Sequence, residues 1–314
     1  MNKIQDLKQI FSQETGLELK TGVSLSEYSS FRIGGPAEYF FEARQLSHLI
    51  KAVETARKYR FPFYVIGGGY NLLFDDAGYN GLIIRNLASG LSFSPEKGWL
   101  EVHSGTYLGE IINLTISAGL GGLEFLAGIP GTAGGAIYGN AGAFGQAIGD
   151  RVVEVVLLGE KGQEIILKKS ELHFGYRHSD LKKNHRVILK AYLKVEQDSS
   201  AAIKKKVQDY LERRSKKHPP RETACAGSFF KNPVLPDGQK IAAGYLLEQV
   251  GAKGMRVGQA AVFPGHCNFI INLGGAIAHD VLSLAAELKE RVWKKFGLLL
   301  EEEVIYIPAT ASMI

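Results

Sequence analysis

Apolar residues recur at helical spacing in several parts of the chain. The clearest case runs from Val281 to Phe296, where an apolar residue returns every three or four positions and Asp280 stands before the run as an N-cap. The same period predicts a helix that begins near Leu108 and stops at Gly119, and others over residues 3–13, 44–59, 201–216 and 241–250.

Runs of β-branched and aromatic residues, or of alternating apolar and polar residues, predict strands between these helices. The strands expected are residues 37–41, 61–66, 81–86, 99–104 and 187–195, a hairpin of 152–158 with 163–167, and a last strand over 298–307 that three glutamates interrupt. Strands and helices alternate early in the chain, which predicts a parallel or mixed sheet and an α+β class.

The segment from Ala118 to Asp150 departs from both periods, because it is unusually poor in side chains. Eleven of its residues are glycines, which turn freely and leave backbone N–H groups open to a polyanion such as a pyrophosphate. A flexible linker is the alternative. Linkers are polar and rich in serine, however, whereas Leu123, Phe125 and Phe144 in this segment need burial.

A second glycine cluster follows the predicted strand 61–66. The strand leads into Gly67, Gly68 and Gly69, with Asn71 just beyond. Neither a P-loop nor a G-x-G-x-x-G fingerprint is present, and such a triplet alone is as often a tight structural turn as a ligand site. Paired with the first glycine segment, it suits a long ligand with a diphosphate in its middle, such as a dinucleotide.

Composition narrows the class of protein. With 314 residues, 45% hydrophobic and 22% charged, the chain can form two or three domains of a globular protein. No apolar run is long enough to span a membrane and the N-terminus lacks a signal-peptide core, so we expect a cytoplasmic protein without membrane association. Cys225 and Cys267 are too few for a disulfide framework, and the scattered histidines predict no metal site.

The net charge of +5 raises the question of a nucleic-acid partner. Aromatic residues are not interleaved with the basic clusters, as a base-stacking surface requires, so we expect no nucleic acid. An excess of cations suits an anionic small substrate equally well.

Three polar segments are candidates for chemistry. They are residues 174–179 around Arg177, residues 226–233 around Ser228, and the acidic residues 301–303. Taken one at a time, each has a structural explanation: Arg177 as a surface charge, Ser228 as a turn residue, and the glutamates as a solvated strand edge.

Together with the glycine clusters, these segments resemble the UDP-N-acetylmuramate dehydrogenases, also called UDP-N-acetylenolpyruvoylglucosamine reductases. The resemblance runs from about Tyr28 to Ile307, in the motifs SSFRIGGPAEYF, IGGGYNLLF, GLEFLAGIPGTAGGAIYGNAGAFG, FGYRHSDL, AGSFFKNP, LLEQVGAKGMRVGQAAV and LEEEV. Between Val195 and Ile203 there is no room for a tyrosine-bearing loop found in one branch of the family, so the chain is similar to the branch that lacks it.

The resemblance implies a PCMH-type FAD-binding fold, like that of vanillyl-alcohol oxidase, in two lobes, followed by a C-terminal α+β substrate domain. On this chain we expect the FAD-binding domain at residues 1–200, with lobes of roughly 1–85 and 86–200. The substrate domain is expected at 201–300, and a terminal strand and tail at 301–314. A shift in composition at residues 196–200 suggests the boundary.

The resemblance also implies an activity. NADPH reduces a non-covalently bound FAD and leaves, and UDP-N-acetylenolpyruvoylglucosamine then enters the same cleft. It is reduced to UDP-N-acetylmuramate, a cytoplasmic step of peptidoglycan precursor synthesis. The NADPH and the sugar nucleotide are the expected partners, and we expect the protein to be a monomer.

Family roles carry over to three residues. Arg177 steadies the negative charge that forms on the substrate, as a permanently protonated group able to bind a carboxylate through two hydrogen bonds. Ser228 donates a proton to the neighbouring carbon, which a weak acid can do only at close range. Glu303 helps polarise the substrate with Arg177, or manages the protons around Ser228.

Other family positions concern binding. The resemblance places Arg213 near the flavin's pyrimidine end, and Lys216 and Asn232 on the sugar nucleotide. Tyr70 stands where the family usually has serine, and Glu302 where it has proline. Backbone donors for FAD are expected at both glycine segments, at Gly67, Gly68, Gly69, Asn71, Gly128, Ile129, Gly131, Thr132, Gly134 and Gly135.

Two other functions are compatible with parts of the pattern. An oxidase of the same fold with FAD attached through histidine is disfavoured, because no histidine lies between His103 and His173. A non-catalytic sugar-nucleotide or nucleic-acid binding protein would be colourless, whereas a flavoprotein is yellow.

Overall fold

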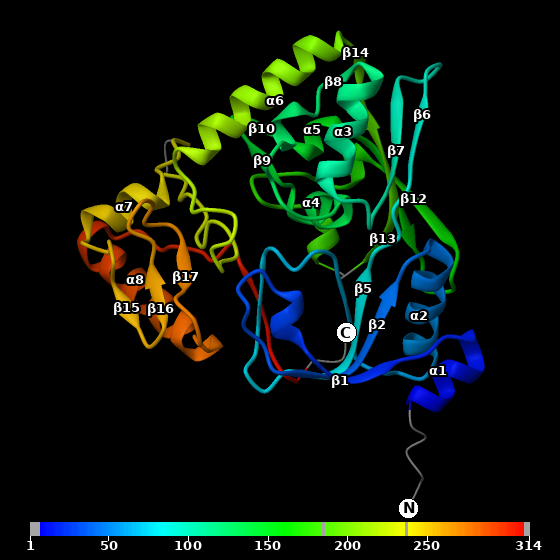
Figure 1. The fold of residues 1–314 in the computed structure, drawn as a ribbon, viewed down its shortest axis with the longest axis horizontal. Coiled ribbons are helices and arrows are strands. Elements are labelled where there is room, and N and C mark those ends of the chain that lie inside the picture. The colour runs from blue at the N-terminus through cyan, green and yellow to red at the C-terminus, as the bar shows by residue number, and fades with distance from the viewer. Residues whose placement is uncertain (1–6, 184–185, 236–237, 311–314) are drawn as a thin grey trace, which may run out of the picture.

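The computed structural model describes residues 7–183, 186–235 and 238–310. Figure 1 shows three units around a common centre: a first lobe in blue, a second in green, and a C-terminal unit from yellow to red. Most predicted elements are confirmed within a few residues. Part of the helix expected over residues 3–13 lies outside the described residues, and α1 begins at Leu7.

The first lobe is built on a four-stranded mixed sheet in the order β1-β2-β5-β3. Strands β2, β5 and β3 are parallel and β1 is antiparallel, as the strand–helix–strand pattern predicts. The strands are β1 (Lys20–Ser24), β2 (Pro36–Ala43), β3 (Phe63–Ile66) and β5 (Tyr79–Asn86), with α1 (Leu7–Thr15), η1 (Leu25–Tyr28) and α2 (Leu46–Lys58) beside them.

The second lobe is built on a five-stranded antiparallel sheet in the order β12-β11-β13-β7-β6. Its strands are β6 (Leu91–Ser94), β7 (Trp99–His103), β11 (Val152–Leu158), β12 (Glu164–Lys168) and β13 (Val187–Lys194). Its helices are α3 (Leu108–Ala118), η2 (Glu124–Leu126), α4 (Ala133–Gly139), α5 (Ile148–Arg151), η3 (Lys169–Glu171) and η4 (Asp180–Lys182). Two short ladders pair β8 (Leu120–Gly121) with β14 (Glu196–Gln197), and β9 (Gly142–Ala143) with β10 (Gln146–Ala147).

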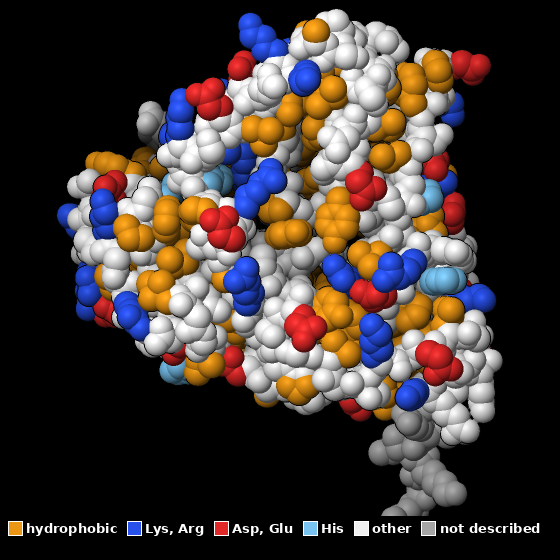
Figure 2. Space-filling view, viewed as in Figure 1, with side chains coloured by type: hydrophobic (Ala, Val, Ile, Leu, Met, Phe, Trp, Pro, Cys, Tyr) orange, Lys and Arg blue, Asp and Glu red, His pale blue; other side chains and the backbone are white. Residues whose placement is uncertain are grey.

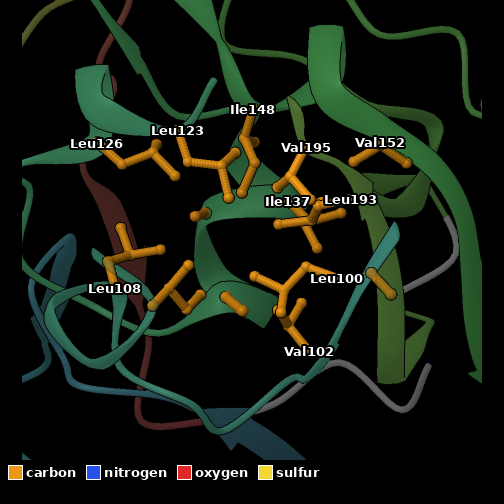
Figure 3. Close-up of a cluster of buried hydrophobic side chains, with 14 of the residues drawn as sticks. Leu100, Val102, Leu108, Leu123, Leu126, Ile137, Ile148, Val152, Leu193 and Val195 are labelled. Carbon is orange, nitrogen blue, oxygen red and sulfur yellow. The ribbon is translucent and has the colours of Figure 1, made fainter. Parts of the chain in front are cut away.

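The sheet of the second lobe is apolar on both faces. Along β11, Val155 and Leu157 enter the core of the second lobe, whereas Val156 and Leu158 pack with α2 and β5 of the first lobe. Side chains alternate between the faces of a strand, so one sheet serves two cores. Figure 3 shows the core of the second lobe, where the glycine-rich segment contributes side chains such as Leu123 and Ile137. That segment is therefore not a linker.

The C-terminal unit packs two helices against a small antiparallel sheet in the order β15-β16-β17. The elements are α7 (Ala243–Gln249), β15 (Arg256–Val257), β16 (Ala260–Val262), β17 (Ile270–Asn272) and α8 (Ala278–Phe296). The sequence pattern indicated both helices, but not this sheet, whose strands are only two or three residues long.

Helix α6 (Ser200–Ser215) connects the second lobe to the C-terminal unit. Its buried residues Ile203 and Val207 belong to the core of the second lobe, together with α3. The domain boundary at residue 200 remains a prediction. From this packing we propose a boundary after α6 instead.

The predicted strand over residues 298–307 is wrong for most of its length. A strand forms only at β18 (Ile305–Ile307), which pairs in parallel with β4 (Leu72–Phe74) of the first lobe. Residues 301–303 have an isolated bridge from Glu302 to Phe230 instead of a ladder. After the C-terminal unit, the last described strand thus lies on the first lobe (Figure 1).

Asp280 is not the N-cap of α8, contrary to the sequence prediction. The N-cap is Ile277, and Asp280 is the third helical residue, which accepts a 3.4 Å hydrogen bond from Ile277 N. The apolar period alone places the first turn too late, because Ala278 already lies in the helix.

A carboxylate from the first lobe supports the start of α8. Asp76 accepts hydrogen bonds from Ala278 N at 2.7 Å and from His279 N at 3.2 Å. The first N–H groups of a helix have no partner within it, and an anion there also interacts favourably with the helix dipole. Asp76 therefore links the first lobe to the C-terminal unit.

We expect Asp76→Ala to lower the free energy of unfolding by about 1 kcal/mol, the usual cost of a lost cap. Asp76→Asn keeps an oxygen acceptor and should lose less. Urea unfolding followed by circular dichroism measures both. Glu287→Ala is the control, since it removes an exposed pair with Arg291 from the same helix. An unchanged urea midpoint for Asp76→Ala would show that the link does not contribute to stability.

Candidate active site

The two glycine loops meet in space. Strand β3 leads into Gly67, whose added Cβ would overlap Thr132 Oγ1, and Gly69 has φ +70° with its missing Cβ directed at the carbonyl oxygen of Tyr28. Glycine is required at Gly67 by close packing, and at Gly69 by both packing and backbone conformation. Thr132 is the N-cap of α4. The loops therefore form one cradle at the end of the first sheet.

Several N–H groups in this cradle are open. Among the described residues, none of the backbone N–H groups from Gly67 to Asn71 makes a hydrogen bond, nor do those of Gly128, Gly131 and Thr132. Contiguous unpaired N–H groups suit phosphate oxygens. The residues present thus fit the diphosphate of FAD.

Three of the predicted FAD donors are engaged inside the protein. Ile129 N donates to Leu126 O at 3.0 Å, and Gly134 N donates to Ser104 O at 2.8 Å. Gly135 N makes a long 3.5 Å contact with Thr132 Oγ1. Glycine is needed at Gly134 for close packing instead, because an added Cβ would press on Ser104.

Arg177 and Glu303 form an ion pair across two units of the molecule. Arg177 Nε lies 2.6 Å from Glu303 Oε1, and about a fifth of each side chain is exposed. The buried Nε–H makes no well-aligned hydrogen bond among the described residues, so its contact with Glu303 is described as an ion pair. Arg177 also adopts φ +53°, which is uncommon for a non-glycine residue. The ion pair therefore fixes the Arg177 side chain beside Glu303.

The backbone of Glu303 joins the other candidate residues to this pair. Glu303 N donates to Phe229 O at 2.8 Å, and Asn71 Nδ2 donates to Glu303 O at 3.0 Å. Phe229 directly follows Ser228, which is half-buried and comes after Gly227 at φ +80°. The structure therefore places Arg177, the Ser228 segment and Asn71, at the end of the loop that begins at Gly67, around one glutamate.

The three consecutive glutamates have different surroundings. Glu301 pairs with Lys231 at 2.9 Å and its side chain is 73% exposed, and Glu302 pairs with Lys289 at 2.8 Å on the surface. Glu303 points inward to Arg177. This difference favours Glu303 over Glu302 as the functional carboxylate.

Burial and neighbouring charges shift the pKa values here. Burial raises the pKa of Glu303, against the opposing effects of Arg177, Lys182 and Lys231. Burial lowers the pKa of Lys182, and the nearby Lys231 and Arg177 lower it further although Glu303 opposes them. Lys182 Nζ also donates to Arg177 O at 2.9 Å. The cluster carries an excess of positive charge beside one buried carboxylate.

Three predicted binding residues have other contacts. Arg213 is exposed with its guanidinium 4.7 Å from the Phe144 ring, and Lys216 pairs with Glu212 at 2.7 Å on the surface of α6. Asn232 Oδ1 accepts a 3.0 Å hydrogen bond from Ala243 N at the start of α7. Their roles remain predictions.

Arg214 is not among the residues predicted from the sequence. This arginine is half-buried, and an added Cβ at Gly128 would touch its side chain. Burial lowers its pKa, and so does Arg177. Helical spacing could have revealed it: counting from Ile203 and Val207, position 214 continues the inward face of α6, whereas position 213 lies to one side. Arg214 is therefore the cation of α6 that faces the glycine cradle.

An open groove lined by Trp99, Lys168 and Phe174 lies on the second lobe. In Figure 2 basic and acidic side chains are interspersed across the visible face. Among the described residues, no helix is long and apolar enough to cross a membrane, and no cluster of metal-ligating side chains occurs.

Comparison with known proteins agrees with this geometry. An "FAD binding domain" family model matches residues 37–168, and a "UDP-N-acetylenolpyruvoylglucosamine reductase, C-terminal domain" model matches residues 218–307. The UDP-N-acetylenolpyruvoylglucosamine reductase of Solibacter usitatus is 37% identical, covering 93% of this chain and 97% of that protein. That of Protochlamydia amoebophila is 38% identical, covering 93% and 94%. The crystal structure of the Thermus caldophilus UDP-N-acetylenolpyruvylglucosamine reductase superposes with a TM-score of 0.76 at 34% identity, covering 93% of this chain and 99% of that one.

The fold and the glycine cradle define an FAD-dependent oxidoreductase with a PCMH-type FAD-binding fold. Within that class, the chain belongs to the family of UDP-N-acetylenolpyruvoylglucosamine reductases. The fold class and the family expected from the sequence motifs are both confirmed.

We expect Gly67→Ala to weaken FAD binding at least about tenfold, or about 1.4 kcal/mol, because its methyl group would push the two loops apart. Titration of the flavin-free protein with FAD, followed by flavin fluorescence, measures the change. Gly109→Ala in α3 is the matched control, since an added Cβ there meets open space. Equal FAD affinity for Gly67→Ala and the unaltered protein would contradict the cradle.

Proposed function

We propose that Arg177, Ser228 and Glu303 carry out the reaction of this family, the reduction of UDP-N-acetylenolpyruvoylglucosamine to UDP-N-acetylmuramate. Bound FAD, once reduced by NADPH, supplies the hydride for the methylene carbon of the enolpyruvyl group. The observation that supports this assignment best is the meeting of all three candidate segments at Glu303.

Arg177 binds and stabilises the substrate carboxylate. Negative charge builds up on the carboxylate and its neighbouring carbon in the transition state, so a fixed cation there lowers the barrier. Guanidinium retains its proton at any physiological pH and can present two parallel N–H donors. Glu303 already contacts the Nε side of this guanidinium at 2.6 Å, so the substrate carboxylate would bind its terminal N–H groups.

Ser228 gives its hydroxyl proton to the carbon that carries the carboxylate. A serine is a weak acid, so this step needs a strongly basic carbon held close and in line. Among the described residues, none makes a hydrogen bond with the Ser228 hydroxyl, so its orientation is set by its backbone and by the substrate.

Glu303 holds Arg177 in position. Its carboxylate lies beside Nε, and its own backbone is hydrogen-bonded to Phe229 and Asn71. These contacts fix the orientation of the guanidinium before the substrate binds. Less free energy is then needed to organise the groups around the transition state.

The remaining charges prepare the cleft for anions. Arg214 and Lys182 add positive potential near Arg177, and both FAD and the sugar nucleotide carry diphosphates. Lys216 and Asn232 remain candidates for contacts with the sugar nucleotide, and Arg213 for the flavin. We propose that the protein acts as a cytoplasmic monomer without nucleic-acid or membrane partners. An absorption spectrum without flavin bands would contradict the whole proposal.

We expect Ser228→Ala to leave flavin reduction by NADPH nearly unchanged. Flavin reoxidation by the enolpyruvyl substrate should slow on the order of 10²–10⁴-fold, because the proton donor is lost. Stopped-flow absorbance of the two half-reactions measures each rate separately. Equal slowing of both half-reactions would show that Ser228 does not donate the proton.

We expect Glu303→Gln to slow reoxidation by the enolpyruvyl substrate about tenfold or more, since it removes the charge paired with buried Arg177. Glu302→Gln is the matched control, as it alters only a surface pair with Lys289. The same stopped-flow assay compares them. A larger effect at Glu302 would place the functional carboxylate one residue earlier.

A further inference from the structure

Asn268 has no role in the function described so far, yet it is 4% exposed in the loop between β16 and β17. Such a buried amide must find hydrogen-bond partners, since an unsatisfied one costs about 1–3 kcal/mol. Both of its partners are backbone atoms of Phe230, the second residue after Ser228. Asn268 Oδ1 accepts from Phe230 N at 2.9 Å, and Asn268 Nδ2 donates to Phe230 O at 2.8 Å.

The backbone of Asn268 contributes a third hydrogen bond. Phe229 N donates to Asn268 O at 2.8 Å. On the opposite side, Phe229 O accepts from Glu303 N, and Phe230 forms a bridge with Glu302. Residues 229–230 therefore lie between Asn268 and residues 302–303, as a central strand lies between two neighbouring strands. On the Asn268 side, a side-chain amide takes the place of the neighbouring strand.

Asn268 is itself held in place. Its N–H donates to His266 Nδ1 at 3.2 Å, and the ring of His266 packs edge-on against Phe269 with centroids 5.0 Å apart. Phe229 and Phe230 are at most 2% exposed. The backbone next to Ser228 is therefore held in place, although the Ser228 hydroxyl itself has no hydrogen-bond partner among the described residues.

We infer that Asn268 is a positioning residue for the proton transfer from Ser228. It does not contact the reacting atoms but sets the register of residues 229–230 against Glu303, and so the distance from the Ser228 hydroxyl to the carbon held by Arg177. This inference rests on the proposed function of Ser228.

The test compares Asn268→Ala with the unaltered holoenzyme in the two half-reactions. Reduction of the flavin by NADPH should remain within about twofold, while reoxidation by UDP-N-acetylenolpyruvoylglucosamine should slow about 100-fold, the usual cost of misplacing a reacting group by about 1 Å. Amide hydrogen exchange at Phe230 should become faster, because its acceptor is removed. Equal slowing of both half-reactions would overturn the inference.

A double-mutant cycle separates positioning of Ser228 from a general structural effect. In the Ser228→Ala background, Asn268→Ala should slow reoxidation by no more than about twofold further, since it acts through a hydroxyl that is already absent. Full additivity would overturn the inference. Asn272→Ala is the matched control: it removes a side-chain amide of the same small sheet that binds Phe31 O and the Gly274 and Ala276 N–H groups. Equal slowing by this control would also overturn it.

A second variant keeps the test decisive if Asn268→Ala does not fold. Asn268→Asp retains the acceptor for Phe230 N and loses the donor to Phe230 O, so it should slow reoxidation less than the alanine variant. An unchanged reoxidation rate overturns the inference alone. Failure of the unaltered protein to reoxidise its flavin with the enolpyruvyl substrate instead overturns the proposed function.

Discussion

The active site depends on the backbone pairing of a short extended segment near the end of the chain. Glu302 bridges to Phe230, Glu303 N binds Phe229 O, and Ile305 N binds Asn71 O. These bonds join the C-terminal unit to the first lobe, and the second lobe adds Arg177 through its ion pair with Glu303. Residues from all three units thus contact Glu303. The geometry of the site therefore forms only when the three units are packed together.

The clustering of cations around Glu303 has an electrostatic cost. Arg177, Lys182 and Arg214 lie within each other's fields, and repulsion from neighbouring cations as well as burial lowers the pKa of the lysine and of Arg214. Glu303 offsets part of the excess while its own pKa is raised by burial. Such a cluster is unfavourable in the free protein and favourable once anions enter. The cluster therefore lowers the local stability of the free protein and raises its affinity for diphosphates and carboxylates. Such a trade-off is common at functional sites.

The sequence predicted the helices, the main strands and the family, and it named three candidate residues whose segments meet at Glu303, because apolar period, glycine content and family motifs are all local patterns. It missed the sheet of β15, β16 and β17, whose strands are too short for a period to appear. It extended the last strand through Glu301. It did not single out Arg214, because a family motif gives positions along the chain and does not show which face of α6 is buried. Asn268 had no sequence signal, since its partners are backbone atoms.

The pairing of β18 with β4 also bears on how the protein becomes active during synthesis. Ile305 lies opposite Leu72, so nearly the whole chain must leave the ribosome before the two strands can meet. The lobes and their cores can form earlier, from residues already available. A nascent or C-terminally clipped chain can therefore resemble the finished enzyme in most of its structure and still lack Glu303, which would leave Arg177 unpaired. Pairing of β18 with β4 is thus a late event, and it fixes the segment that carries Glu303 beside Arg177.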